Sequence, residues 1–442
     1  MDALLVANGT VLTLGAHSRV LANHDVLCRD GVIERIAPRG TIDAQGARVL
    51  DASRRVVMPG FINAHTHLYS TFARGITGLR SSTSFREVLE HLWWRLDRAL
   101  ALEDCGLSAL VAMTDAVRHG TTTLIDHHAS PSAVRGSLDV IASAAMRVGV
   151  RACLCYEVSD RDGERVAGEG IEENSRFVRR CQVEGGDRLR ALFGLHASFT
   201  VSDATLASVA EAGKRLGAGF HVHAAEAASD QEHAVRVFGA RVIERFRAFD
   251  VLGPRTIAAH CVHVDDREME VLAATGTTVI HNPQSNMNNA VGAADVRRLQ
   301  RHGVLVGLGT DAMTENMLEE LRAALWLRHL TQADPSAGFA DTVSLLLANN
   351  AAIANRHWQG RLGEVREGAL ADLVVIDYDP PTPLEEGNLG GHVVFGLSQA
   401  AVDATIVGGR VLMAGRRLEL DLDEAELAAH ARERARALWE RL

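Results

Sequence analysis

The feature that most constrains this chain is a regular alternation of short apolar segments with longer amphipathic ones between residues 59 and 367. The short segments are rich in β-branched residues and have the length of buried strands, whereas the longer ones have helical periodicity. The eight strand segments are residues 61–67, 122–128, 151–156, 189–196, 219–225, 256–261, 277–281 and 304–311. Eight strand–helix units over about 300 residues predict a TIM-like (β/α)8 barrel.

An open, doubly wound α/β sheet is the alternative architecture for the same pattern. Such a sheet normally carries a glycine-rich, phosphate-binding turn directly after its first strand. The pattern begins here with residues 58–63 (MPGFIN), which contain no turn of this kind. The barrel is therefore the favoured fold.

The two ends of the chain have a different sequence pattern, in which short apolar segments typical of strands alternate with turn signals such as Asp30-Gly31. Neither end is long enough to bury a core by itself, so we expect them to combine in one composite β-sandwich domain. The last residues are rich in Ala, Glu, Arg and Leu and predict a helix. The expected units are residues 1–58 with 368–421, the barrel at 59–367, and a C-terminal helix at 422–442.

Composition excludes several classes of protein. The net charge of −10 disfavours nucleic acid as a partner. No apolar run approaches the roughly 18–20 residues that span a bilayer, and the first residues lack the features of a secretory signal. The six cysteines include no CxxC pair, so we expect reduced thiols in a cytoplasmic protein that does not bind membranes.

Polar residues fall at the ends of the predicted strands. Seven of the eight segments end at or near a histidine or an aspartate: His67, His128, His196, His223, His260, His281 and Asp311. In a barrel, the carboxyl ends of the strands form the face that carries the active site. Burying so many imidazoles at one face without a role would leave several polar groups unsatisfied.

Four of these positions predict a metal site. His65 and His67 lie two residues apart and therefore share one face of a strand. Taken singly, such a pair also fits two buried structural histidines, and Asp311 also fits a helix N-cap. With His223 they form a nitrogen-rich set with one carboxylate, which suits zinc or ferrous iron and leaves a position for water. Glu226, three residues after His223, is placed to move protons to and from that water.

Five motifs in this order resemble the amidohydrolase superfamily. They are residues 61–67 (FINAHTH), 223–226 (HAAE), 259–262 (AHCV), 281–286 (HNPQSN) and 309–311 (GTD). Within it, the chain is similar over nearly its whole length to the branch of adenosine-type, guanine and cytosine deaminases and triazine chlorohydrolases. Residues 93–97 (WWRLD), 126–131 (DHHASP) and 153–157 (CLCYE) resemble in particular the Ssn-type aminohydrolases.

The resemblance implies a role for each site residue. One divalent ion, with zinc ahead of iron, would be held by a set of four ligands: His65, His67, His223 and Asp311. Glu226 would shuttle protons, and His260 would polarise the group under attack or orient the water. Asp311 would also accept a proton from the attacking water, and His196 would contact the substrate.

The lysine content argues for a single metal ion. Amidohydrolases with two metals usually bridge them with a carboxylated lysine at a strand end. The only lysine, Lys214, lies in a predicted helix before the fifth strand. A mononuclear site is therefore expected, with Cys153, Cys155 or a carboxylate as the alternative bridge.

Further pocket residues are expected around this centre. Adjacent strand residues point to opposite faces, so only one of His127 and His128 can face the pocket; we name His128, with His281, as candidate substrate contacts. Arg74 follows the first strand and could bind an anionic or carbonyl group. Trp93 lies in a helix-like run, for which helix packing is the ordinary interpretation.

These residues predict a hydrolytic deaminase of an amino-substituted, nitrogen-rich heterocycle such as a purine or pterin base. Hydroxide activated by the metal would attack the ring carbon that bears the amine, and ammonia would leave. The loop after the first strand lacks the acidic-Leu-Pro sequence associated with adenosine-analogue deaminases, which argues against a nucleoside. The alternatives are hydrolysis of a cyclic amide or of a chlorinated triazine-like ring, and a non-catalytic barrel scaffold. The expected assembly is a homo-oligomer, a dimer or a tetramer.

Overall fold

All eight predicted strand segments form strands in the computed structural model, which describes residues 3–358 and 361–442. The strands are β6 (Phe61–Thr66), β7 (Thr121–Asp126), β8 (Arg151–Leu154), β9 (Leu189–Ala191), β10 (Phe193–Ala197), β11 (Phe220–Ala224), β12 (Ile257–His260), β13 (Thr278–His281) and β14 (Val306–Leu308). One segment differs from its prediction, because residues 189–196 contain two strands. β9 pairs with β8, whereas β10 pairs with β11.

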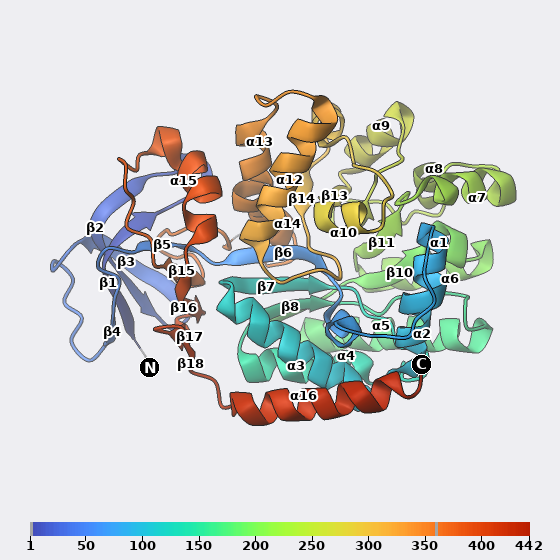
Figure 1. Cartoon of the computed structure of the whole chain (residues 1–442), viewed down its shortest axis with the longest axis horizontal. Helices are drawn as coiled ribbons and strands as arrows, with labels where there is room; N and C mark the ends of the chain where they lie inside the picture. The colour runs from blue at the N-terminus through green and yellow to red at the C-terminus, as the bar shows by residue number, and fades with distance from the viewer. Residues whose placement is uncertain (1–2, 359–360) are drawn as a thin grey trace.

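The strands form two parallel sheets, one of β6-β7-β8-β9 and one of β10-β11-β12-β13-β14. Helices cover their outer side (Figure 1). The larger ones are α3 (Leu102–Arg118), α4 (Ser137–Val148), α5 (Glu164–Glu184), α6 (Asp203–Leu216), α7 (Ala228–Phe238), α9 (Asp266–Thr275) and α12 (Met317–Gln332). The shorter ones are α1 (Phe85–Val88), α2 (Trp94–Ala99), α8 (Val242–Ala248), α10 (Pro283–Asn288), α11 (Val296–Arg301), α13 (Phe339–Ser344) and α14 (Asn350–Ala354). A doubly wound sheet reverses its strand order at a switch point, and neither described sheet does so.

The two parallel sheets touch at both of their edges. Thr66, at the end of β6, forms a parallel bridge with Asp311, just beyond β14. On the other side, Val158, beyond β8, forms a parallel bridge with Leu195 of β10. The chain therefore brings its first and last parallel strands together at the end that carries the predicted site.

Glycines permit these two close approaches. A Cβ atom on Gly309 would lie 2.7 Å from the backbone oxygen of His65. A Cβ atom on Gly194 would lie 2.2 Å from the backbone oxygen of Tyr156. Any larger residue at either position would push the two sheets apart.

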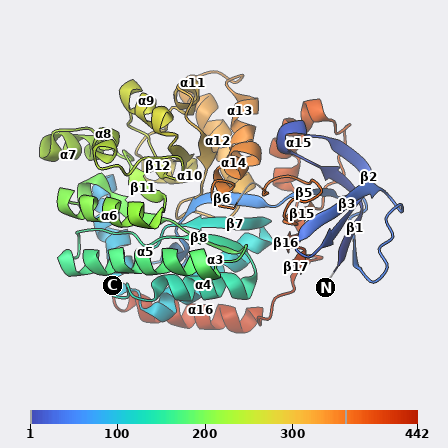
Figure 2. The ribbon, with the colours of Figure 1, turned by 180° about the vertical axis from the view of Figure 1, so that it is seen from behind.

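The two ends of the chain form one nine-stranded sheet. Its strands are β1 (Leu4–Leu12), β2 (Val20–Arg29), β3 (Val32–Pro38), β4 (Arg48–Asp51), β5 (Val56–Pro59), β15 (Leu373–Ile376), β16 (Val402–Val407), β17 (Arg410–Ala414) and β18 (Arg417–Leu418). The join is an antiparallel pairing of β5 with β15. Both views show these strands together at one end of the molecule, beside α15 (Leu389–Phe395) (Figures 1 and 2).

The chain ends in α16 (Glu424–Trp439), which lies along α3 (Figure 1). Arg434 bonds the fully buried carboxylate of Asp104 at 2.7 Å, and the indole nitrogen of Trp439 donates to the backbone oxygen of Phe72 at 2.8 Å. Among the described residues, we find no helix that combines the length and the apolar character needed to cross a bilayer.

A buried ion pair joins β8 to the end sheet. Arg151 Nε lies 2.6 Å from Asp372 Oδ2, and Arg151 Nη2 lies 2.9 Å from Asp372 Oδ1. The Arg151 side chain has no exposed surface, and Asp372 also accepts a bond from the backbone nitrogen of Gly408. Two parallel bonds to a carboxylate fix the direction as well as the distance between the two parts.

Replacing Arg151 with Met should destabilise the protein by about 3–5 kcal/mol, because Asp372 would stay buried without its counter-charge. Denaturant unfolding measures this loss. Arg135→Met is the matched control, since Arg135 and Glu172 form an exposed pair worth less than about 1 kcal/mol. Equal stability of the two variants would show that the buried pair does not hold the end sheet in place.

Candidate metal centre and active site

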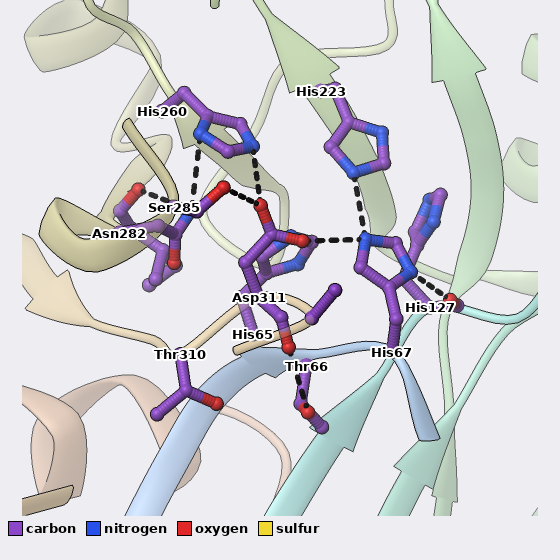
Figure 3. Close-up of polar contacts among 12 residues, drawn as sticks. His65, Thr66, His67, His127, His223, His260, Asn282, Ser285, Thr310 and Asp311 are labelled. Carbon is purple, nitrogen blue, oxygen red and sulfur yellow. Dashed lines mark hydrogen bonds and ion pairs between the residues drawn. The ribbon is translucent and has the colours of Figure 1, made fainter. Parts of the chain in front are cut away.

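Four of the predicted residues lie together at the carboxyl ends of β6, β11 and β14 (Figure 3). His67 Nε2 lies 3.0 Å from Asp311 Oδ1, and His65 Nε2 lies 3.7 Å from the same oxygen. The facing nitrogens of His67 and His223 are 3.1 Å apart. The structure thus brings together the four residues that were predicted as metal ligands.

Hydrogen bonds to backbone carbonyls fix the tautomers of His67 and His223. His67 Nδ1 donates to the backbone oxygen of His127 at 2.5 Å, and His223 Nδ1 donates to the backbone oxygen of His196 at 2.8 Å. In a neutral imidazole the other nitrogen then carries a lone pair. If both rings are neutral, the two Nε2 lone pairs face each other, and a cation between them relieves this repulsion; in the metal-free protein a proton on His67 Nε2, held by Asp311 at 3.0 Å, does the same. Two nitrogens on one tetrahedral zinc are about 3.3 Å apart, close to the observed spacing.

His65 is oriented by a different partner. Its Nδ1 lies 2.8 Å from His221 Nε2, and His221 Nδ1 lies 3.8 Å from Cys155 Sγ. The Cys155 thiol donates to the backbone oxygen of Asp126. With donation running in this direction along the chain, His65 Nε2 keeps its lone pair, and it is buried without a hydrogen-bond partner.

The charges in the cluster also favour a cation. Although burial opposes both shifts, the contact with Asp311 raises the pKa of His67 to about 9, and His67 holds the pKa of Asp311 below its ordinary value. Ser285 Oγ donates to the other oxygen of Asp311 at 2.5 Å. The donors therefore fit a divalent ion in composition, in tautomer and in charge.

No lysine reaches this cluster. Lys214 lies on the exposed surface of α6, where its amine is 3.7 Å from Asp250. Cys153 and Cys155 are buried, and burial raises the pKa of both thiols, so neither is a ready thiolate ligand.

His260 differs from the three other histidines in its tautomer. The side-chain amide of Asn286 donates to His260 Nδ1 at 2.9 Å, which leaves the proton on Nε2. Burial lowers the pKa of His260 to about 4, so the ring is neutral near pH 7. Its Nε2–H lies 3.4 Å from Glu226 Oε2 and 3.7 Å from Asp311 Oδ2. His260 is thus a hydrogen-bond donor at the centre.

Glu226 is a buried carboxyl beside this donor. The Asn289 amide donates to its Oε1 at 3.3 Å. Burial raises the pKa of Glu226, and the neighbouring charge of Asp311 raises it further. A carboxyl whose pKa is raised in this way holds a proton more readily, so it can act as both acid and base.

Two of the strand ends at this site have strained backbone. His260 and Asp311 have φ values of 72° and 55°, and neither is a glycine. The left-handed region costs a non-glycine residue roughly 1–3 kcal/mol, a cost commonly found at active sites. These two turns aim the side chains of β12 and β14 at one point.

A cavity of about 60 Å3 opens on this cluster. Its polar lining includes His67, His223, Glu226 and Asp311. Its aromatic lining is Tyr69, Phe85, Trp93, Trp94 and Phe199. A small cavity with flat apolar walls beside converging polar groups suits a flat, polar ligand.

Only one of the four predicted substrate contacts lines this cavity. His196 lines the cavity, but His128, His281 and Arg74 do not. His128 points away from it and bonds Ser130 Oγ at 2.9 Å, because its neighbour His127 takes the inward direction.

The other two predicted substrate contacts, His281 and Arg74, line different cavities. His281 lines a separate cavity near Arg328, on the outer side of β13. Arg74 lines a larger cavity of about 590 Å3 against α16.

Several lining residues were not predicted as site residues. These are Tyr69, Trp94, Asp97, Glu157, Ser285 and Asn289. A signal existed for some of them, since Trp94, Asp97 and Glu157 lie in the segments 93–97 and 153–157. Those segments are far apart in sequence, so only the folded chain shows that they share one wall.

Comparisons with known proteins agree with this geometry. Residues 56–412 match the model of the Amidohydrolase family. The chain belongs to the amidohydrolase family.

Two curated relatives match this amidohydrolase over 100% of both chains at 31% identity. One is a 5-methylthioadenosine/S-adenosylhomocysteine deaminase of Pelotomaculum thermopropionicum, and the other is a 5'-deoxyadenosine deaminase of Methanosarcina mazei. A solved adenosine deaminase from Xanthomonas campestris with bound zinc superposes with a TM-score of 0.87 at 25% identity, covering 100% of this chain and 99% of that one. The guanine deaminase of E. coli shares the fold, with a TM-score of 0.78 at 19% identity, covering 94% of this chain and 100% of that one.

The facing lone pairs predict that a divalent cation stabilises this protein. Adding zinc to chelator-treated protein should raise the free energy of unfolding by about 4 kcal/mol once free zinc exceeds its dissociation constant about 1,000-fold. His67→Ala should abolish most of this gain. His302→Ala is the control, because His302 bonds only Asp266 on the surface. An unchanged response to zinc in His67→Ala would contradict the assignment.

Proposed function

We propose that this amidohydrolase is a hydrolytic deaminase of an amino-substituted, purine-type heterocycle. In this proposal His65, His67, His223 and Asp311 hold one divalent ion, with zinc as the first choice and iron as the second. The observation that carries the proposal is the division of roles around one cavity. His65, His67 and His223 each have Nδ1 hydrogen-bonded elsewhere and turn Nε2 toward a metal position, whereas His260 presents an N–H donor beside a carboxyl whose pKa is raised by burial.

The chain's own groups supply the proton steps. A bound divalent ion would bring the pKa of water from 15.7 to about 7. Asp311, a carboxylate beside that ion, would accept a proton from the water that attacks the ring carbon. His260 Nε2–H stabilises the charge that develops on the ring. Glu226 delivers a proton to the amine, and the carbon–nitrogen bond breaks to release ammonia.

The named activities of the relatives support this choice of reaction. Two full-length relatives are named deaminases of adenosine-type compounds, and the zinc-bound structural neighbour is named an adenosine deaminase. The site retains every residue of the expected ligand set, which disfavours a non-catalytic scaffold.

We infer further that the two parallel sheets close into the (β/α)8 barrel of residues 59–367 through the bridges at their edges. The nine-stranded sheet of residues 1–58 and 368–421 then folds over its apolar cluster as a composite β-sandwich. The six cysteines are free thiols, which supports a cytoplasmic location. A homo-oligomer, dimer or tetramer, completes the proposal.

Glu226→Gln tests the proton shuttle. Ammonia release from adenine, adenosine or a pterin by the zinc-loaded variant should fall by about 10²–10⁴, the usual size of general acid–base catalysis, while the zinc content stays unchanged. Glu232→Gln, on the exposed face of α7, should keep full activity.

Two outcomes count against the proposal. Full activity of Glu226→Gln would remove the shuttle. Chloride or a ring-opened product without ammonia, from wild-type enzyme given a chlorotriazine or a cyclic amide, would point to the alternative hydrolysis.

A further inference from the structure

A buried charged cluster lies on the cavity wall and has no part in the proton steps above. Arg161 Nη2 donates to Asp97 Oδ2 at 2.8 Å and lies 3.3 Å from Glu157 Oε1. The three side chains are 6%, 2% and 4% exposed, respectively. Asp97 comes from α2, whereas Glu157 and Arg161 follow β8.

This cluster is short of positive charge. One guanidinium faces two carboxylates in a buried setting, which is costly, and Glu157 Oε2 lies 3.2 Å from His127 Nδ1, where a shared proton offsets part of this charge. Asp97 Oδ1 is buried and has no hydrogen-bond partner. Asp97 and Glu157 both line the cavity, whereas Arg161 lies behind Trp94, with its guanidinium 5.0 Å from the ring centre. Arg161 Nη1 is also buried without a partner, so the chain leaves both an acceptor and a donor of this cluster unpaired, and a ligand at the wall would supply partners from outside the chain.

His196 adds a third acceptor to the same wall. The Thr200 hydroxyl donates to the backbone oxygen of Ala197, so His196 Nδ1 must donate to Thr200 Oγ1 at 2.6 Å. His196 Nε2 therefore presents a lone pair, and it lies 3.8 Å from Glu157 Oε1. Two acceptors that face each other at this distance are close enough to share the N–H donors of one ligand group.

The wall also lies next to the reacting centre. Single ligand atoms of Glu157, His196 and His223 all lie within 4.8 Å of one another. A ring held against His223 with its amine toward Glu226 would therefore turn another edge to Glu157 and Asp97. The aromatic side chains of Trp94 and Phe199 flank this space and suit the faces of a flat ring.

We propose that Glu157 and Asp97 are specificity residues that select heterocycles bearing a further N–H donor, an amino group or a ring N–H, besides the amine that is removed. Arg161 is a positioning residue that holds both carboxylates in place. This inference rests on the proposed deaminase function and names its substrate class, a guanine- or pterin-like ring rather than a ring without donors at that edge.

The test compares two probes that differ by one amino group, adenine and 2,6-diaminopurine. Calorimetric titration of zinc-loaded Glu226→Gln, which binds with little turnover, measures affinity directly. 2,6-Diaminopurine should bind about 10–100-fold more tightly than adenine, the usual worth of a hydrogen bond to a charged group. Ammonia release by the wild-type enzyme should show the same preference in kcat/KM.

Substitutions at Glu157 separate recognition from a structural role. In Glu157→Leu the two purines should bind about equally, and the change should appear mainly in KM. Glu157→Gln keeps an acceptor oxygen and should therefore keep part of the preference for 2,6-diaminopurine. Both should fold, because Arg161 keeps Asp97 as its partner, and zinc content and thermal unfolding check this. Glu169→Gln is the control, since exposed Arg165 and half-buried Glu169 form a pair with the same spacing along the chain, away from the cavity.

Equal binding of the two purines, or no binding of either, would overturn the inference. A preference that persists unchanged in correctly folded Glu157→Leu would do the same. Absence of ammonia release from every probe, with the binding preference intact, would instead overturn the deaminase proposal and leave the recognition wall supported.

Discussion

The rest of the site depends on one close contact, the approach of two imidazole nitrogens. His67 and His223 each donate their Nδ1 proton to a backbone carbonyl, and their Nε2 atoms lie 3.1 Å apart. Neither ring can turn away without leaving a buried carbonyl unpaired, which would cost about 1–3 kcal/mol. The backbone thus fixes a place for positive charge, which is a proton on His67 in the metal-free protein or a bound cation that displaces it, and Asp311 supplies the compensating negative charge.

The same reasoning explains why neighbouring groups of one residue type have different chemistry. The partner of Nδ1 decides whether Nε2 is a lone pair or a donor, and a side-chain amide in place of a carbonyl makes His260 the donor. The two carboxyls also diverge, since the contact with His67 lowers the pKa of Asp311 while burial raises that of Glu226. Environments that push two pKa values apart commonly separate the base from the acid.

Much of this arrangement could be predicted from the sequence, because periodicity and strand-end position are local signals. All eight strand segments were found, and the rule that barrel sites lie at carboxyl ends brought His65, His223 and Asp311 together. The same rule failed for His128 and His281. Position at a strand end gives proximity but not side-chain direction, and direction depends on neighbours contributed by other elements.

Contacts between distant segments were the second feature of the structure that the sequence did not predict. The division of residues 189–196 into two strands follows from Gly194, whose lack of a side chain lets β10 approach the backbone of Tyr156. Likewise, Asp97 and Glu157 lie side by side on the cavity wall because both contact Arg161, and no sequence pattern within either segment predicts this contact. These contacts join residues that lie far apart in the sequence, so local propensity and residue spacing do not predict them.

The charges around the cavity limit which ligands it can accept. Among the described residues that line it, we find no arginine or lysine, and Arg74, which was expected to meet an anionic group, lies in another cavity. A divalent ion would offset Asp311, but it would leave the carboxylates of Glu157 and Asp97, which share the single guanidinium of Arg161. A phosphate or carboxylate on the ligand would have to enter against that charge in a buried, weakly screened space. A neutral ring that donates hydrogen bonds to these carboxylates would instead stabilise their buried negative charge. The electrostatics of the wall and the small size of the cavity therefore both favour a small, neutral, hydrogen-bond-donating heterocycle.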